Sequence, residues 1–156
     1  MFADYSDHFH ALDIVEMMKL YAIDPMGGGA ELNSFSQNNL VDALSQIEGA
    51  FTILAYFNKK VVGLVNCIPG FSTFYCKPLI NVHDLVVKKS SRGHKIAGKM
   101  LELVEREAVE RGCCKLTLEV LEGNQSAQRA YRQFGFSGYE LNPKMGHAMF
   151  WEKKLN

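Results

Sequence analysis

The chain has 156 residues, of which 47% are hydrophobic and 22% are charged, and this predicts one compact domain with a substantial core. Lysine plus arginine and aspartate plus glutamate both number 17, so no overall positive field would recruit nucleic acid or an anionic membrane. No segment approaches the ~20 apolar residues of a membrane span. We therefore expect a cytoplasmic protein without nucleic-acid or membrane partners.

Two helices are predicted in the first third of the chain. Apolar residues recur at helical spacing from Phe9 to Tyr21, and the pattern ends before Asp24-Pro25. Gly27-Gly28-Gly29 indicates a loop. A second helix is predicted from about Ser36 to Ile47, with Gly49 just beyond its end.

A hairpin is predicted next. Phe51–Phe57 and Lys60–Cys67 are rich in β-branched and aromatic residues and flank Asn58-Lys59, which suits a tight turn. The segment Ile68–Pro78 contains Pro69-Gly70 and three aromatic residues. We expect it to form a loop whose aromatic side chains pack against the core, with a pocket lining as the alternative.

A strand, a helix and a second strand follow in close succession. Leu79–Val87 is apolar enough for a buried strand. Gly93–Arg111 has a clear helical stripe and ends at Gly112, and Lys115–Val120 alternates as a strand does. This order predicts a right-handed crossover that joins two parallel strands. Three polar residues interrupt the first strand and need an explanation: Asn81, His83 and Asp84.

The last quarter of the chain is expected to close the fold. A helix is predicted from about Asn124 to Phe134, ending at Gly135. Phe136–Tyr139 and Ala148–Leu155 are expected to be short closing strands.

The turn between the apolar strand and the long helix is basic. Five cations and no acidic residue lie between Leu85 and Leu101. A helix start exposes backbone N–H groups without intrahelical partners, so it suits a phosphate ester. A solvated basic face is the alternative explanation. The cations are Lys88, Lys89, Arg92, Lys95 and Lys99.

Two common phosphate-binding motifs do not fit this turn. Gly93–Lys99 matches G-x-x-x-x-G-K, but the next residue is Met100 where a nucleotide-binding P-loop needs Ser or Thr to hold magnesium. The chain has no G-x-G-x-x-G, so a dinucleotide site of the Rossmann type is not supported.

The turn resembles the pyrophosphate loop of the GCN5-related N-acetyltransferase family, whose pattern is Gln/Arg-x-x-Gly-x-Gly/Ala. Here it is Arg92-Gly93-His94-Lys95-Ile96-Ala97, with Lys95 in place of the usual glycine. Asn124-x-x-Ala127-x-x-x-Tyr131-x-x-x-Gly135-Phe136 is similar to the family's second cofactor motif, Asp84–Val87 to its fourth strand, and Phe150–Leu155 to its last strand. The resemblance is strong from about Asn81 to Glu140.

The resemblance implies an α/β (α+β) fold in a single domain over residues 1–156, with the cofactor-binding core at about 81–140. A central mixed, mostly antiparallel sheet would be flanked by about four helices. Its fourth and fifth strands, Leu79–Val87 and Lys115–Val120, would be parallel and splayed.

The implied co-substrate is acetyl-CoA, with no metal. Lys88, Lys89, Arg92 and Arg132 are candidates for its phosphate charge. The implied cofactor-binding residues are Leu85, Val86, Val87, Arg92, Gly93, His94, Lys95, Ile96, Ala97, Gly98, Asn124 and Tyr131.

The family pattern also implies catalytic roles. Tyr131 would be the general acid toward the leaving thiolate, although its helical spacing alone also fits a core tyrosine. Asn124 would bind pantetheine or serve as a helix N-cap. The base would be His83, with Asp84 orienting it, or Asp84 itself, or a water molecule. An N–H group near Leu85 would meet the oxyanion.

A covalent route through a cysteine is the mechanistic rival. The four cysteines form no C-x-x-C pair and lie away from zinc-site histidines, so we expect reduced thiols and no structural metal. Two of them have no activating neighbour in the sequence, and the adjacent pair at the start of the fifth strand is expected to lie away from the thioester, so direct transfer in a ternary complex is favoured. They are Cys67, Cys76, Cys113 and Cys114.

The acceptor is expected to be a small-molecule primary amine, with a protein amine as an alternative. Its walls would come from Phe9–Asn33 and Pro69–Pro78, which carry no substrate signature. A non-catalytic acyl-CoA-binding sensor is the competing function. The family also implies a homodimer as one assembly, which the sequence neither supports nor excludes.

Overall fold

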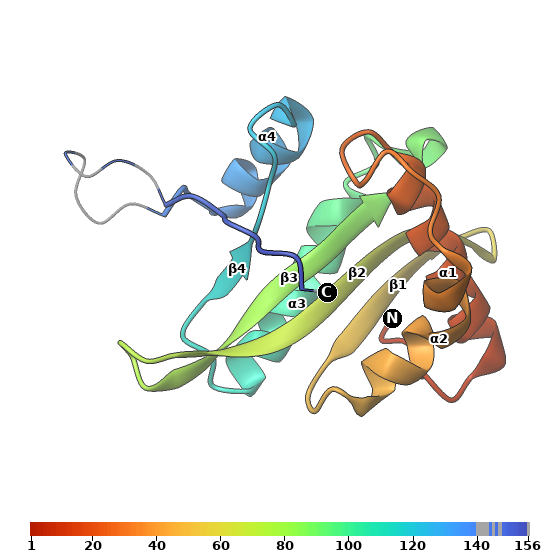
Figure 1. Cartoon of the computed structure of the whole chain (residues 1–156), viewed down its shortest axis with the longest axis horizontal. Helices are drawn as coiled ribbons and strands as arrows, with labels where there is room; N and C mark the ends of the chain where they lie inside the picture. Colours follow the sequence, from red (N-terminus) through yellow and green to blue (C-terminus); the bar gives the residue numbers. More distant parts are fainter. Residues whose placement is uncertain (140–143, 145, 147, 156) are drawn as a thin grey trace. The chain divides into compact units, whose positions relative to one another are not determined.

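A computed structural model of the chain describes residues 1–139, 144, 146 and 148–155. The chain divides into two compact units, Met1–Leu118 and Glu119–Asn156. The first unit holds a sheet with three α-helices, and the described residues of the second form one α-helix (Figure 1). The expectation of a single domain over residues 1–156 stays a prediction. No helix in the described part of the chain has the length and apolar content needed to span a bilayer.

The two predicted N-terminal helices are confirmed, and each has a side-chain cap. α1 (His8–Ile23) begins after Asp7, whose carboxylate accepts two backbone N–H groups of the first turn. α2 (Ser34–Gln46) begins after Asn33, whose Oδ1 accepts the Ser36 N–H at 2.8 Å. Such caps satisfy backbone donors that a helix start leaves unpaired.

The sheet has four strands in the order β1-β2-β3-β4. The first three pair antiparallel, and β3 and β4 pair parallel, so the predicted mixed sheet is confirmed. The helix α3 (Ile96–Glu110) connects the parallel pair. The strands are β1 (Phe51–Phe57), β2 (Lys60–Ser72), β3 (Lys77–Val87) and β4 (Leu116–Leu118).

The first residues of the chain also pair with the sheet, which the sequence did not predict. Phe2 forms an isolated antiparallel bridge with Ile53 on β1. The Ala3 N–H donates to the Thr52 carbonyl at 2.8 Å, and the Leu54 N–H donates to the Met1 carbonyl at 2.9 Å. The first three residues therefore pair along the outer side of β1.

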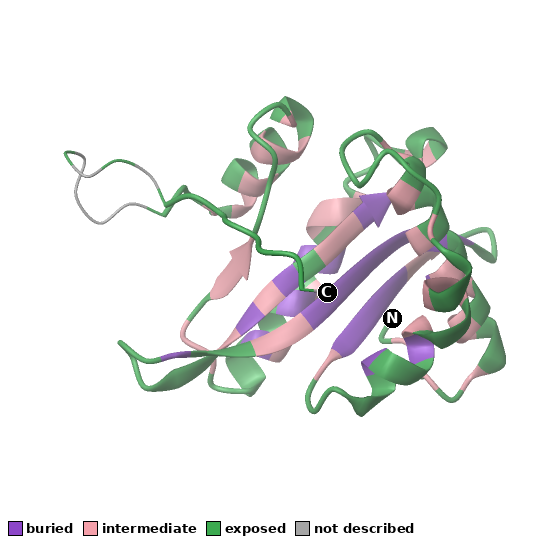
Figure 2. Ribbon diagram, in the orientation of Figure 1, coloured by how far each residue is buried: buried purple, intermediate pink, exposed green. Residues whose placement is uncertain are grey.

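Helices cover both faces of the sheet in the first unit (Figure 1). On one face, apolar residues of α1 and α2 form a core cluster with Leu54, Leu64 and Val86. On the other face, α3 buries Met100, Leu101, Val104 and Ala108. In the sheet, burial covers the first four residues of β1, residues 61–67 of β2, and alternate positions and the C-terminal end of β3 (Figure 2). The two layers fix the sheet from both sides.

The expected loop Ile68–Pro78 is wrong, because β2 and β3 continue as a hairpin through most of it. Pro69 pairs with Ile80, whose N–H donates to Lys115 on the other side of β3. The nitrogen of Pro69 therefore faces away from β3, toward the side of β2 on which β1 lies. The β1 ladder reaches only Cys67, so the proline costs no backbone hydrogen bond between strands. The expected aromatic packing is also wrong, since Phe71, Phe74 and Tyr75 are exposed.

Two other boundaries differ from expectation. The helix begins at Ile96 rather than Gly93, because Gly93 and Lys95 adopt positive φ angles of 86° and 58°. The strand expected at Lys115–Val120 is shortened to β4.

The second unit contains α4 (Gln125–Phe134), which confirms the last predicted helix. It ends at Gly135, whose φ of 105° is left-handed and suits glycine. The strands expected at Phe136–Tyr139 and Ala148–Leu155 are not formed in the described residues. One backbone bond joins the two segments, from the Ala148 N–H to the Tyr139 carbonyl at 3.3 Å.

Candidate functional site

The C-terminal half of β3 has no strand partner on one side within the first unit. β4 pairs with β3 only from Ile80 to Val82. The Lys88 N–H donates to Val62 on β2, and alternate residues point to opposite edges. The backbone N–H and C=O groups of Leu85 and Val87 therefore face the edge that β4 leaves uncovered, as the predicted splay requires.

A bulge in β3 lies just before this uncovered segment. Asp84 pairs with Asn66 and Val82 pairs with Cys67, so His83 has no opposite residue on β2. Such a bulge bends a strand and increases its twist. His83 is exposed, whereas Asp84 is half-buried and accepts a hydrogen bond from Asn66 Nδ2 at 2.9 Å. The two candidate bases thus have different surroundings.

The remaining polar interruption of β3 is structural. Asn81 Nδ2 donates to Thr117 Oγ1 on β4 at 3.1 Å, across the short parallel pairing. This side-chain bond lies at the point where the two strands begin to separate.

The predicted phosphate turn ends at a helix start without a side-chain cap. After a short 3₁₀ turn (Lys89–Ser91), the left-handed Lys95 is the N-cap of α3 and makes no side-chain cap bond. The N–H groups of Ile96, Ala97 and Gly98 come too early for intrahelical bonding. Apart from its chain neighbours and the adjacent backbone of α3, a Cβ placed on Gly98 would meet no atom of the described residues within 4 Å. The turn therefore offers backbone donors with open space beside them.

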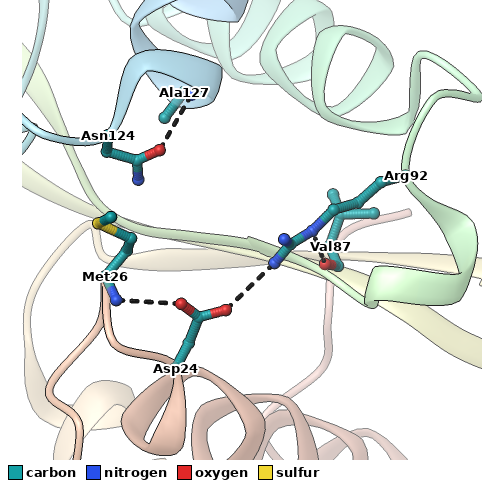
Figure 3. A network of polar contacts seen from close by, with 6 residues as sticks. All are labelled: Asp24, Met26, Val87, Arg92, Asn124 and Ala127. Atoms are coloured by element: carbon teal, nitrogen blue, oxygen red, sulfur yellow. Dashed lines mark hydrogen bonds and ion pairs between the residues drawn. The ribbon is translucent and has the colours of Figure 1, made fainter.

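Arg92 ties this turn to the end of α1 (Figure 3). Its Nε donates to the Val87 carbonyl at 3.1 Å, and its terminal nitrogen contacts Asp24 Oδ2 at 3.3 Å. The other Asp24 oxygen accepts the Met26 N–H at 3.0 Å. These bonds lower the pKa of Asp24, with the Met26 N–H as the largest cause and Arg92 contributing. The Arg92 side chain is thus oriented by the protein itself.

Other predicted cations have protein partners too. Lys88 forms an ion pair with Glu16 of α1 at 2.5 Å. In the second unit, Arg132 donates to Gln128 Oε1 at 2.8 Å. Lys89, Lys95 and Lys99 are exposed. The exposed lysines supply the positive charge around the start of α3.

The predicted residues of the second unit lie on α4. Asn124 caps the helix, because its Oδ1 accepts the Ala127 N–H at 3.1 Å (Figure 3). The cap uses the carbonyl oxygen of this amide and does not use Nδ2. Tyr131 is half-buried and contacts Phe136 edge to face, with ring centroids 5.9 Å apart. One of the two alternatives for Asn124, the N-cap, is thereby confirmed.

The cysteines give no support to a covalent route. All four are free thiols. Cys67 is fully buried in β2, and burial raises the pKa of its thiol to about 12. Burial also raises the pKa of Cys113. A nucleophilic cysteine requires the opposite shift, toward the thiolate.

A hollow of about 700 Å³ lies elsewhere, on the α3 face of the sheet next to β1. Its lining includes residues of the turn and of the first turn of α3 but neither the uncovered β3 edge nor the candidate bases; the former are Ser90, Ser91, His94, Ile96 and Lys99. The hollow therefore borders the start of α3 but not the uncovered edge of β3.

The first unit thus brings most of the predicted site residues together. The segment from His83 to Gly98 runs without interruption from the bulge, along the uncovered edge, to the start of α3. Two partners of this segment, Asp24 and Asn66, were not predicted from the sequence. Asn66 stands alone as a polar residue inside an apolar strand, which was an available signal. Asp24 carried no comparable signal.

The sequence comparisons identify relatives. Residues 14–136 match the sequence pattern described as the acetyltransferase (GNAT) family. A thialysine N-ε-acetyltransferase of Bos taurus is 31% identical over 75 residues, which are 44% of this chain and 44% of that protein. The chain spans about half the length of the curated relatives it matches.

Solved structures share the fold at low sequence identity. An aminoglycoside acetyltransferase from an uncultured soil metagenomic sample, in complex with trehalose, has a TM-score of 0.78 at 16% identity, covering 100% of this chain and 95% of that chain. The aminoglycoside acetyltransferase AAC(6')-Iy, in complex with a bisubstrate analogue of CoA, has a TM-score of 0.75 at 14% identity, covering 95% and 94%.

The backbone of Lys95 generates a prediction about stability. Lys95→Gly is expected to raise the free energy of unfolding by about 1 kcal/mol, because a left-handed backbone is strained for any residue with a Cβ. Lys99→Gly is the matched control in the first turn of α3, and it is expected to lower the same quantity by about 1 kcal/mol. Urea denaturation of the three proteins measures both changes. A loss of stability in Lys95→Gly would contradict the strain.

Proposed function

Because the chain belongs to the acetyltransferase (GNAT) family, we propose that it transfers the acetyl group of acetyl-CoA to a primary amine by direct attack in a ternary complex. The observation that carries this proposal is the uncovered edge of β3, which leads directly into the uncapped start of α3. A backbone edge and a helix start in series suit a ligand that has amides at one end and phosphates at the other.

The residues of the first unit suit the parts of acetyl-CoA, which supplies the acetyl group as a thioester. The N–H groups of Ile96, Ala97 and Gly98 would hold the pyrophosphate, with exposed lysines adding charge. The Leu85 carbonyl and the Val87 N–H would bond the two amides of pantetheine as an added strand does, which leaves the Leu85 N–H for the oxyanion. The Val87 carbonyl already accepts Arg92, so the Val87 N–H is the more available of its two groups.

The proposed reaction moves two protons from the acceptor. The ammonium first loses one proton to His83, Asp84 or a water molecule. The amine nitrogen then bonds to the thioester carbon, and the Leu85 N–H meets the oxyanion. The C–S bond breaks, and the sulfur takes a proton from Tyr131, which regains one from the nitrogen. The products are an amide, free CoA thiol and one released proton.

The proposed acceptor is a small-molecule primary amine. This agrees with the bovine relative, a thialysine N-ε-acetyltransferase, and with the aminoglycoside acetyltransferases among the solved structures. Near β3, the Asp84 carboxylate is bonded by a neutral amide and supplies negative charge, which favours a cationic acceptor. A protein amine remains the alternative acceptor.

The direct test is release of CoA thiol from acetyl-CoA in the presence of a panel of amines. We expect release that depends on both acetyl-CoA and one class of small amine, with the acetylated product identified by mass. Tight binding of acetyl-CoA with no release for any amine, including lysine peptides, would contradict transfer.

Gly98 allows the proposed phosphate position to be tested by charge alone. Because open space surrounds Gly98, both Gly98→Asp and Gly98→Asn fit without a clash. A carboxylate in the first turn stabilises a helix by about 0.3–1 kcal/mol, yet it repels a bound phosphate. We therefore expect Gly98→Asp to bind CoA at least about tenfold more weakly than Gly98→Asn in calorimetry, with equal or higher thermal stability. Equal affinities would place the phosphates elsewhere.

Tyr131 is tested by removing its hydroxyl. Tyr131→Phe is expected to lower kcat by about 100-fold with little change in the KM for acetyl-CoA, because a general acid acts mainly on the leaving thiolate. Tyr139→Phe, at an exposed tyrosine of the same unit, is the control and keeps kcat within about twofold. An unchanged kcat in Tyr131→Phe would remove this residue as the acid.

A further inference from the structure

A line of polar side chains crosses the α1 face of the sheet and ends at Asp84. Tyr5 Oη lies 3.0 Å from Thr52 Oγ1, which donates to Asn66 Oδ1 at 2.7 Å. Asn66 Nδ2 donates to Asp84 Oδ2 at 2.9 Å. Thr52 and Asn66 are 0% and 2% exposed, so their hydrogen bonds lie inside the core.

The hydrogen bonds in this line all run toward Asp84. Thr52 has one hydroxyl hydrogen, which goes to Asn66, so Tyr5 must be the donor to Thr52. Asn66 receives at its oxygen and donates from its nitrogen, to Asp84 and also to Met18 Sδ at 3.4 Å. A flipped amide would turn its oxygen toward a carboxylate oxygen, which leaves two acceptors facing each other. The hydroxyl of Thr52 therefore fixes the direction in which Asn66 donates.

The bond from Asn66 holds one oxygen of Asp84 and leaves the other available. Among the described residues, no hydrogen bond reaches Asp84 Oδ1, and the residue is half-buried rather than enclosed. Asp84 directly precedes Leu85, whose N–H faces the uncovered edge of β3. His83, by contrast, lies in the bulge and is exposed. Within the described residues, Asp84 is the candidate base that a buried partner orients.

We propose that Asn66 is a positioning residue for the acetyl transfer, an inference that rests on the proposed function. It holds the Asp84 carboxylate through Oδ2, so that Oδ1 is oriented to take the first proton from the acceptor ammonium. Thr52 and Tyr5 act one step further away by fixing the amide of Asn66. A buried polar line that served stability alone would not need to end on a partly exposed carboxylate beside the reacting edge.

Thr52 is the position at which the line can be cut with least damage. Thr52→Val keeps the shape of the side chain and removes the hydroxyl, so Asn66 loses the group that orients it. We expect kcat to fall by about tenfold, with the KM for acetyl-CoA within about twofold of wild type. Thr52→Ser, which restores the hydroxyl, is expected to recover most of the lost kcat.

A double-variant cycle separates positioning from stability. In an Asp84→Asn background, Thr52→Val is expected to change the residual kcat by less than about twofold, because the carboxylate that it positions is gone. Ile53→Val changes the adjacent buried residue, which alternation of side chains along β1 points to the opposite face of the sheet. It serves as a control of comparable destabilisation with unchanged kcat.

The outcomes distinguish this inference from the function on which it rests. Wild-type protein that releases no thiol with any amine overturns the proposed function and the positioning role together. Wild-type turnover with equal kcat in Thr52→Val overturns the positioning role alone. If Thr52→Val still lowers kcat tenfold in the Asp84→Asn background, the positioning role is also overturned, because Thr52 would then act through another group.

Discussion

The short pairing between β3 and β4 is the constraint on which the site depends. Three residue pairs join the two strands, and β3 then continues for five residues without β4. Backbone groups at a sheet edge need partners, and two residues of β3 present theirs there. The bulge at His83 lies at the transition, and Asn81 bonds across the last paired stretch. The geometry of the site thus follows from where one ladder stops.

The two faces of the sheet contribute differently around this edge. On the α3 face the packing is apolar, and Gly63 lets α3 approach, because a Cβ there would lie 2.9 Å from the end of the Met100 side chain. On the α1 face the same strands carry Thr52, Asn66 and Asp84 side by side. Burying such groups is costly unless each is hydrogen-bonded, and in this row each is. The α3 face thus supplies apolar packing, whereas the α1 face combines an apolar core with a hydrogen-bonded polar row.

Local patterns in the sequence predicted most elements of the fold but not their long-range partners. The stripe of α3 and the Asn58-Lys59 turn, whose φ angles of 49° and 63° suit a tight hairpin, depend on neighbouring residues. Pro69-Gly70 indicated a loop, yet the proline is tolerated because β1 has ended beside it, which no local pattern reveals. For the candidate site, the Arg92–Ala97 pattern indicated the turn and the strand before it. Asp24 and Asn66 were missed because their roles arise from contacts 68 and 18 residues away in the chain.

The left-handed backbone at Gly93 and Lys95 affects how an anion would be captured. Fixing the backbone of a residue costs roughly 1–2 kcal/mol in conformational entropy, and here that loss has already occurred during folding. An incoming anion therefore meets donors that already converge and does not have to order a mobile loop. Its arrival would be governed by diffusion in the field of the surrounding lysines, so encounter would slow as the ionic strength rises.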